Sequence, residues 1–263
     1  MLLIDLSYYI FYRYYATYNW YIKQKEAKER KSVTQDPLFL EKYDKMFEKA
    51  LTDLQKKFDI SSENVYFAKD CSREDIWRTK HYEAYKKTRE ERLDTFDREI
   101  FKHSISTLIP QLQTKYKFKL LFLDHLEADD IIAIVKQYER SKHPQKEIFI
   151  VTNDNDYVQL IDDYTLVVNL QGKDLKTRID CVPEEYLKRK IILGDKSDNI
   201  ASIAKKIGEK TSAKLANDDA ALEALFEKNP DAKVNYELNK LLISFDSIPK
   251  NLRQQVIENY IRT

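Results

Sequence analysis

The stretch VTNDNDYVQL, residues 151–160, places Asp154 and Asp156 directly after the apolar run IFIV. Two carboxylates about 4 Å apart repel each other by roughly 4 kcal/mol at an effective dielectric constant of 20. These two side chains therefore either point into water as turn residues or share a positive charge. The rest of the chain has to decide between the two possibilities.

Four short apolar runs, rich in β-branched or aromatic residues, predict buried strands. They are LLI (2–4), NVYFA (64–68), KLLFL (119–123) and EIFIV (147–151). Longer stretches between them have the helical spacing of apolar residues, namely 39–58, 96–116 and 128–141. Strands that alternate with helices predict an α/β fold, in which helices flank a central, mostly parallel sheet.

A coarse division of the chain falls near residue 185, because the sequence from EEYLKRKIIL onward has helical character to its end. We expect residues 1–185 to form the α/β core and residues 186–263 to form a helical region packed on that core. The tyrosine-rich segment 8–24 is expected to be a helix against the sheet, with stacking on bases as the alternative.

Composition excludes several classes of protein. Charged residues make up 34% of the 263 residues and hydrophobic residues 43%, which is typical of a soluble globular chain with a large core. Cys71 and Cys181 are far apart and have no histidines at ligand spacing, which excludes a disulfide framework or a cysteine-type zinc site and indicates a reducing compartment. Asp5 interrupts the first apolar run and no small-residue cleavage site follows it, so no signal peptide is expected. No membrane span is expected either, because no apolar run approaches about 18 residues.

Acidic residues follow every one of the four apolar runs. In chain order they are Asp5, then Asp70, then Glu127 with Asp129 and Asp130, then Asp154 with Asp156. Each of them alone could be a turn residue or a helix N-cap. Because functional sites in open α/β sheets lie beyond the carboxyl ends of the strands, we expect these acids to converge on one edge. Asp195 and Asp198 in GDKSDN add a fifth group, with a spacing that puts both on one helix face.

Carboxylates that cluster without cysteine or suitably spaced histidine select hard cations such as Mg²⁺ or Mn²⁺. Two such ions about 4 Å apart form the clamp that is used for in-line displacement at phosphorus. Calcium is a weaker interpretation, because the EF-hand loop pattern is absent. The acids therefore favour phosphodiester hydrolysis with two metal ions.

Basic and aromatic residues interleave in CSREDIWRTKHYEAYKKTREER, residues 71–92. Cations follow phosphates and aromatic faces stack on unpaired bases, so this segment could bind a single strand; a salt-bridged helix in solvent has the same composition. A second patch, IAKKIGEKTSAK (203–214), holds four lysines around Gly208. Backbone N–H groups and lysines at such a turn can contact a phosphate backbone. Because the net charge is only +1, any nucleic-acid surface depends on local segregation of charge.

The order of the motifs resembles that of the 5′-nuclease superfamily, which includes flap endonucleases and bacteriophage 5′–3′ exonucleases. The matching motifs are LLIDLS, FAKD, YKKTR, LEADDIIA, VTNDNDYVQL and ILGDKSDNIASI, and they span nearly the whole chain. GDKSDNIAS in particular resembles the RNase H type of T-even bacteriophages. The resemblance implies a PIN-like core with a helical arch at about residues 78–103 and a C-terminal helix–hairpin–helix-like region.

The same resemblance implies a metal-dependent 5′–3′ exonuclease and flap endonuclease with RNase H activity, which removes RNA primers and adjacent DNA from lagging-strand fragments. It implies two Mg²⁺ ions, replaceable by Mn²⁺. The first site would draw on Asp5, Asp70, Asp130 and Asp154, with Glu127 and Asp129 close by. The second would use Asp156, Asp195 and Asp198. A potassium ion is also common in the turn after GDxxDN, but that turn keeps only Gly208 here, which argues against the ion.

The resemblance also assigns roles to basic residues. Lys86 and Arg89 match a pair at the base of the arch that stabilises charge on the scissile phosphate, and with Asp130 they are the expected catalytic residues. The expected contacts with nucleic acid are Arg78, Lys80, Tyr85, Lys87, Lys205, Lys206 and Lys210. Tyr85 is expected to stack on a terminal base, and residues 194–214 to hold the duplex by its backbone.

We expect a monomer whose substrates are DNA and RNA–DNA hybrids with a 5′ end or flap, with a single-strand-binding protein or a sliding clamp as partner. The expected location is the cytoplasm, that of a bacterial host if the chain comes from a phage. One alternative is a module that holds flaps or single strands without cleaving them. Another is a toxin-like ribonuclease with a similar acidic core, although such chains lack a helical region with GDKSDN. The presence of every expected metal carboxylate favours an active enzyme.

Overall fold

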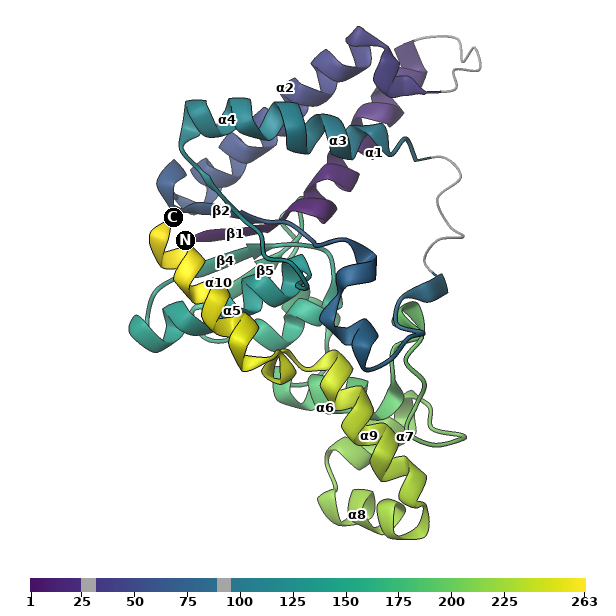
Figure 1. The fold of residues 1–263 in the computed structure, drawn as a ribbon. Helices are drawn as coiled ribbons and strands as arrows, with labels where there is room; N and C mark the ends of the chain where they lie inside the picture. The colour runs from purple at the N-terminus through teal and green to yellow at the C-terminus, as the bar shows by residue number, and fades with distance from the viewer. Residues whose placement is uncertain (25–31, 89–95) are drawn as a thin grey trace.

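The computed structural model describes residues 1–24, 32–88 and 96–263. Within these residues the strands form one parallel sheet of five, in the order β3-β2-β1-β4-β5 (Figure 1). The strands are β1 (Leu2–Asp5), β2 (Val65–Ala68), β3 (Lys119–Leu121), β4 (Ile148–Val151) and β5 (Thr165–Val168). The predicted α/β fold with a parallel sheet is confirmed, and four of the strands lie in the predicted runs. The edge strand β5 is additional.

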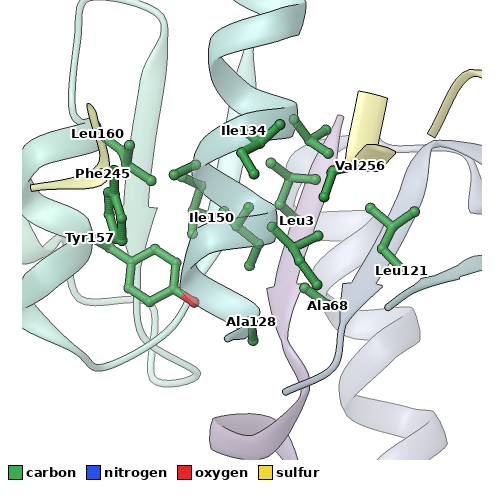
Figure 2. Close-up of a cluster of buried hydrophobic side chains, with 14 of the residues drawn as sticks. Leu3, Ala68, Leu121, Ala128, Ile134, Ile150, Tyr157, Leu160, Phe245 and Val256 are labelled. Carbon is green, nitrogen blue, oxygen red and sulfur yellow. The ribbon is translucent and has the colours of Figure 1, made fainter. Parts of the chain in front are cut away.

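Side chains of β1 alternate between two cores, one on each face of the sheet. Leu3 points to the face that is covered by α5 (Ala128–Lys142) and α10 (Lys250–Arg262), where it joins Ile150 and Val256 (Figures 1 and 2). Leu2 and Ile4 point to the opposite face. Because both faces are covered, β1 is apolar at every position before Asp5, as is typical of parallel strands.

Four helices cover the second face: α1 (Leu6–Gln24), α2 (Pro37–Phe58), α3 (Glu99–His103) and α4 (Ile109–Tyr116). The predicted helix 96–116 is α3 and α4 joined by a π-helical turn, Ser104–Leu108. The segment 8–24 lies in α1, as predicted, and packs on the sheet. Its Tyr9 is fully buried and donates a hydrogen bond to the Phe47 carbonyl oxygen.

The C-terminal third is helical, as predicted. It consists of α6 (Pro183–Leu193), α7 (Glu209–Ala216), α8 (Asp219–Lys228), α9 (Pro230–Ile243) and α10. Helices α6 to α9 form a lobe with its own small apolar cluster, including Ile192, Leu215 and Phe226 (Figure 1). Helix α10 then returns to the sheet and packs beside α5. Among the described residues, no helix is both long and apolar enough to cross a bilayer.

Candidate metal centre and nucleic-acid interface

A cavity of about 1740 Å³ lies at the carboxyl ends of the strands and reaches the lobe of α6 and α7. Acidic residues from five separate segments of the chain line it, among them Asp5, Asp70, Glu127, Asp129, Asp154 and Asp195. The parallel sheet places β1, β2 and β4 side by side, so the residues that follow them meet at one edge. The expected convergence of the acids is therefore what the structure shows.

Asp5 and Asp70 form the inner part of this wall, and neutral groups hold both carboxylates. Asp5 accepts hydrogen bonds from the Tyr8 N–H at 3.0 Å, the Thr152 hydroxyl at 3.2 Å and the Tyr157 hydroxyl at 3.3 Å. Burial, together with the charges of Asp70 and Asp154, raises the pKa of Asp5 to about 7. Negative charge is therefore concentrated at this edge of the sheet, and a bound cation would neutralise it.

Asp70 accepts hydrogen bonds from the Ser7 hydroxyl and, at 2.8 Å, from the Ala128 N–H at the start of α5. Burial, the largest cause, and the charge of Glu127 raise the pKa of Asp70. The contact with Ala128 ties the loop after β2 to the helix that carries the next acids. Asp70 and the start of α5 are thus held as one unit.

Glu127 is the N-cap residue of α5, and basic residues surround its carboxylate. Lys86 Nζ lies 2.5 Å from Glu127 Oε1 and 3.7 Å from Asp198, so it bridges the strand edge and the GDKSDN loop. Burial alone would raise the pKa of Glu127, but the charges of Lys86 and Arg78 hold it below its usual value. Lys86 also lines the cavity, in agreement with its expected place near the acids.

Asp130 differs from the expectation. Its carboxylate forms a fork with Arg78, at 2.7 Å and 2.8 Å, and accepts a third hydrogen bond from Trp77 Nε1 at 3.1 Å. It is fully buried, completes the capping box with the Glu127 N–H, and does not line the cavity. Successive residues of a helix point about 100° apart, so Asp129 faces the cavity in its place.

Asp129 has the opposite environment from its neighbour. Burial and the nearby charges of Glu127 and Asp130 raise its pKa well above the usual value. Asp130 is thus paired with Arg78, and Asp129 is the residue of this pair that lines the cavity. Glu127, Asp129 and Asp130 nevertheless lie close together, with one oxygen of each within 4.8 Å of the others.

Asp156, Asp195 and Asp198 come together as a second group, as expected, with one oxygen of each within 4.8 Å of the others. Asp195 and Asp198 do not lie on an α-helix. Asp195 is the N-cap residue of a 3₁₀ turn, Lys196–Asp198, and its side chain accepts the Ser197 N–H at 2.8 Å, whereas Asp198 is the last residue of that turn. Gly194 precedes them with a φ of 78°, and a Cβ at that position would lie 2.4 Å from the Ala201 carbonyl oxygen.

Lys190, which matches none of the predicted site positions, belongs to this second group. Its Nζ contacts Asp156 Oδ1 directly and lies 2.8 Å from Asp195 Oδ2. Burial would raise the pKa of Asp195, but Lys190 lowers it to about 2. The only signal in the sequence is the position of Lys190 five residues before Asp195, in the last turn of α6.

Asp154 and Asp156, the two acids of the opening stretch, therefore face different partners. Asp154 lines the cavity, and its Oδ1 also accepts the Asp156 N–H at 2.9 Å, as in a tight turn. Asp156 instead pairs with Lys190. The turn geometry is therefore present, whereas the positive charge beside Asp156 is that of Lys190, which this residue shares with Asp195.

Two of the expected nucleic-acid contacts are buried. Arg78 is 2% exposed and donates to Asp130, Glu127 and, at 2.8 Å, the Leu242 carbonyl oxygen. Tyr85 is 4% exposed, and its hydroxyl donates to Glu127 at 3.0 Å. Both side chains are internal partners of the acids at the start of α5, so a phosphate contact at Arg78 or stacking at Tyr85 would require these hydrogen bonds to break.

The segment with Lys86 is fixed to the GDKSDN loop by Asn199. The Lys86 N–H donates to the Asp198 carbonyl oxygen at 3.1 Å. Asn199 Nδ2 donates to the Ala84 carbonyl oxygen at 2.8 Å, and Asn199 Oδ1 accepts from the Thr88 hydroxyl at 2.6 Å. The sequence does not predict this role of Asn199, because no local sequence pattern distinguishes an asparagine that holds a distant segment from one that faces solvent in a turn.

The remaining expected contacts are exposed. Lys80, Lys87, Lys205, Lys206 and Lys210 all reach solvent, and Lys210 also lines the cavity. Arg89 lies outside the described residues, as does the central part of the expected arch at 78–103. The described ends of that arch are a 3₁₀ turn, Trp77–Lys80, and helix α3.

Comparison with known proteins agrees with this geometry. Residues 1–191 match the family model of the 5′-3′ exonuclease, N-terminal resolvase-like domain. Ribonuclease H of Enterobacteria phage T4 is 27% identical over 235 residues, which cover 79% of this chain and 73% of that protein. DNA polymerase I of Lactococcus lactis subsp. cremoris is 26% identical over 252 residues, and the chain spans about a quarter of its length, 27%.

Two solved structures share the fold over almost the full length. One is the T5 5′-exonuclease with bound zinc, with a TM-score of 0.67 and 15% identity, covering 100% of this chain and 98% of the other. The other is a T5 flap endonuclease in complex with DNA and metal ions, with a TM-score of 0.69 and 15% identity, covering 99% and 97%. Because the family model matches well over half of its residues, the chain belongs to the 5′–3′ exonuclease family of phosphodiester hydrolases.

Proposed function

We propose that this chain is a divalent-metal-dependent 5′ nuclease that cleaves DNA and RNA–DNA hybrids at a 5′ end or flap, and that it removes RNA primers and adjacent DNA during replication. The observation that carries the proposal is the convergence of acids from five segments of the chain in one cavity that Lys86 also lines. The names of the T4 and T5 relatives support the proposal, since they include a ribonuclease H and a flap endonuclease bound to DNA.

The donor set fits hard divalent cations. Every acidic residue of the two groups offers carboxylate oxygens, and the raised pKa of Asp5 comes from burial and from the charges of Asp70 and Asp154. Oxygen donors of this kind suit Mg²⁺ and Mn²⁺. Asp5, Asp70, Asp129 and Asp154 would hold the first ion, with Glu127 beside them; Asp156, Asp195 and Asp198 would hold the second. When bound, such ions lower the pKa of water and neutralise charge on phosphate oxygens.

The residues of the chain perform the remaining tasks. Lys86 places a positive charge inside the cavity, where it stabilises the extra negative charge that develops on the scissile phosphate. The hydrogen bonds of Asn199 to Ala84 and Thr88 hold the segment of Lys86 in place. Arg89 would add a second cation. Lys205, Lys206 and Lys210 contact the duplex through its phosphates, which carry no sequence information. A single-strand-binding protein or a sliding clamp is the kind of partner that replication supplies.

A time course on two substrates labelled at the 3′ end of the downstream strand tests this function. One is a primer-like RNA–DNA strand on a template, the other a 5′ DNA flap, each with Mg²⁺, with Mn²⁺ and with chelator. Short 5′ products that appear only with metal are expected, and the ratio of the rates measures the preference for primer or flap. Binding without cleavage in either metal would contradict the proposal and favour a non-cleaving flap-binding module.

A further inference from the structure

The ammonium group of Lys190 lies within the second acidic group. Helix α6 ends at Leu193, and its last turn directs Lys190 between Asp156, which follows β4, and Asp195, which follows α6. The Lys190 side chain is 14% exposed, and so is that of Asp195. This lysine contacts two of the three acids that would hold the second ion.

The first acidic group has a different kind of partner. Asp5 and Asp70 accept hydrogen bonds from backbone N–H groups and hydroxyls, none of which carries a charge. Lys86 pairs with Glu127 at the edge of that group. The inner carboxylates thus retain their excess negative charge, whereas Asp156 and Asp195 are already compensated by Lys190.

From this contrast we infer that Lys190 is an internal competitor of the second divalent ion, so that the second ion binds more weakly than the first. The inference deepens the proposed function and rests on it. A divalent ion and an ammonium group a few ångströms apart repel each other strongly, so both cannot occupy the space between Asp156 and Asp195. Binding of the second ion therefore requires Lys190 to withdraw.

Lys190 has room to withdraw. It lines the cavity of about 1740 Å³, and its flexible four-carbon stem can carry the ammonium group into that space. A lysine that must leave before the ion binds raises the concentration of metal that is needed to fill the second site. Negative charge from a phosphate in the cavity would favour the same exchange, because it attracts both the ion and the released lysine.

Calorimetric titration of the free protein with Mn²⁺ tests this inference. The wild type should show one tighter and one weaker step. Lys190→Met removes the ammonium group and keeps much of the stem, so the second step should tighten about tenfold or more, while Lys190→Arg should stay close to the wild type. Lys196→Met is the control, since Lys196 is an exposed lysine next to Asp195 that lines the same cavity.

An unchanged second step in Lys190→Met would overturn the inference. An equal tightening in Lys196→Met would overturn it too, because the effect would then be one of general charge. If instead no Mn²⁺ binds to the wild type, the metal part of the proposed function fails together with the inference. If the wild type binds two Mn²⁺ ions with equal affinity and Lys190→Met does not change either step, the inference about Lys190 fails but the proposed metal dependence stands.

A second measurement does not depend on the folding of Lys190→Met. In wild-type protein with ¹⁵N-labelled lysine, the ammonium signal of Lys190, identified by its loss in Lys190→Arg, should persist through the first Mg²⁺ step. It should shift or disappear during the second step. A signal that is unchanged at saturating Mg²⁺ would show that Lys190 stays in place, and would overturn the inference.

Discussion

Asp129 and Asp130 are adjacent in the chain, yet their carboxylates have opposite surroundings. Asp129 faces the cavity beside Glu127, and burial raises its pKa well above the usual value. Asp130 forms a buried fork with Arg78. The two residues therefore provide a matched pair of substitutions, one directed at chemistry and one at stability.

Asp129→Asn should reduce single-turnover cleavage by at least about a hundredfold, because it removes a charged oxygen from the inner group. Its stability without metal should be equal to that of the wild type or higher, since a buried and repelled charge is lost. Cleavage under excess enzyme and unfolding in urea measure the two effects. Wild-type cleavage in this variant would contradict the assignment of Asp129 to the inner site.

Asp130→Asn should lower the free energy of unfolding by about 3–5 kcal/mol, because it leaves the Arg78 guanidinium buried with a weakened partner. Urea unfolding of both variants under the same conditions gives the comparison. If Asp130→Asn unfolds like the wild type and still loses all cleavage, then Asp130 acts in the metal site as the resemblance implied.

The raised pKa of Asp5 predicts how stability depends on pH without metal. Burial, followed by the charge of Asp70, raises this pKa from 3.8 to about 7, so between these values the folded state keeps a proton that the unfolded state has lost. Stability should therefore fall as the pH rises from about 4 to about 7, by up to about 1.4 kcal/mol per pH unit. Urea unfolding in chelator should show this slope, and Asp5→Asn should reduce it by the contribution of this one carboxyl, since the raised pKa values of Asp70 and Asp129 act in the same direction.

At the scale of elements, several hydrogen bonds join the segment of Lys86 to the loop between α6 and α7. Asn199 holds this segment through Ala84 and Thr88, and the Lys86 N–H donates to the Asp198 carbonyl oxygen. The position of the Lys86 ammonium group thus depends on a loop more than a hundred residues away.

Asn199→Ala should slow single-turnover cleavage about tenfold or more, because a small displacement of Lys86 weakens its effect on the phosphate. Binding of the first Mn²⁺ should not change, since Asn199 does not contact Asp5 or Asp70. Asn217→Ala, an exposed asparagine that pairs with Glu185, is the control and should cleave like the wild type. A wild-type rate in Asn199→Ala would contradict the positioning role.

At the scale of the whole molecule, the two predicted parts of the chain share a core. Phe245 and Val256 belong to the same buried cluster as Leu3 and Ile150 (Figure 2), and Leu252 is a member of it too. We therefore propose that the division near residue 185 separates two functions, cleavage and duplex binding, and does not separate two units that unfold independently.

Leu252→Ala should test that proposal, since the side chain of Leu252 is buried against the core. The expected cost is about 2–5 kcal/mol, in a single transition that includes the whole chain. Ile261→Ala, in the same helix but 62% exposed, should change stability by less than about 0.5 kcal/mol. Two separate transitions, of which only one responds to Leu252→Ala, would contradict shared unfolding.

The sequence alone predicts the sheet and the edge at which the acids meet. Local patterns in the sequence indicate which segments are buried. A continuous apolar run such as IFIV predicts a strand that is buried on both faces of the sheet, and the acid that follows the run indicates where the strand ends. Parallel order then brings Asp5, Asp70 and Asp154 together. Strand β5 escapes this reasoning because its four residues, TLVV, form a strand only by pairing with β4 at the edge of the sheet.

The pairing of charges was decided only by the tertiary structure. Arg78 and Asp130 are 52 residues apart, Lys86 and Glu127 are 41 apart, and Lys190 and Asp156 are 34 apart. A local pattern shows that these side chains are charged, but not whether they face water, a phosphate or one another. Desolvation makes an unpaired buried charge costly, so Glu127, Asp130 and Asp156 pair with the cations that the fold brings within reach. That is why Arg78 and Tyr85 became internal partners, and why Lys190 lies in the second acidic group.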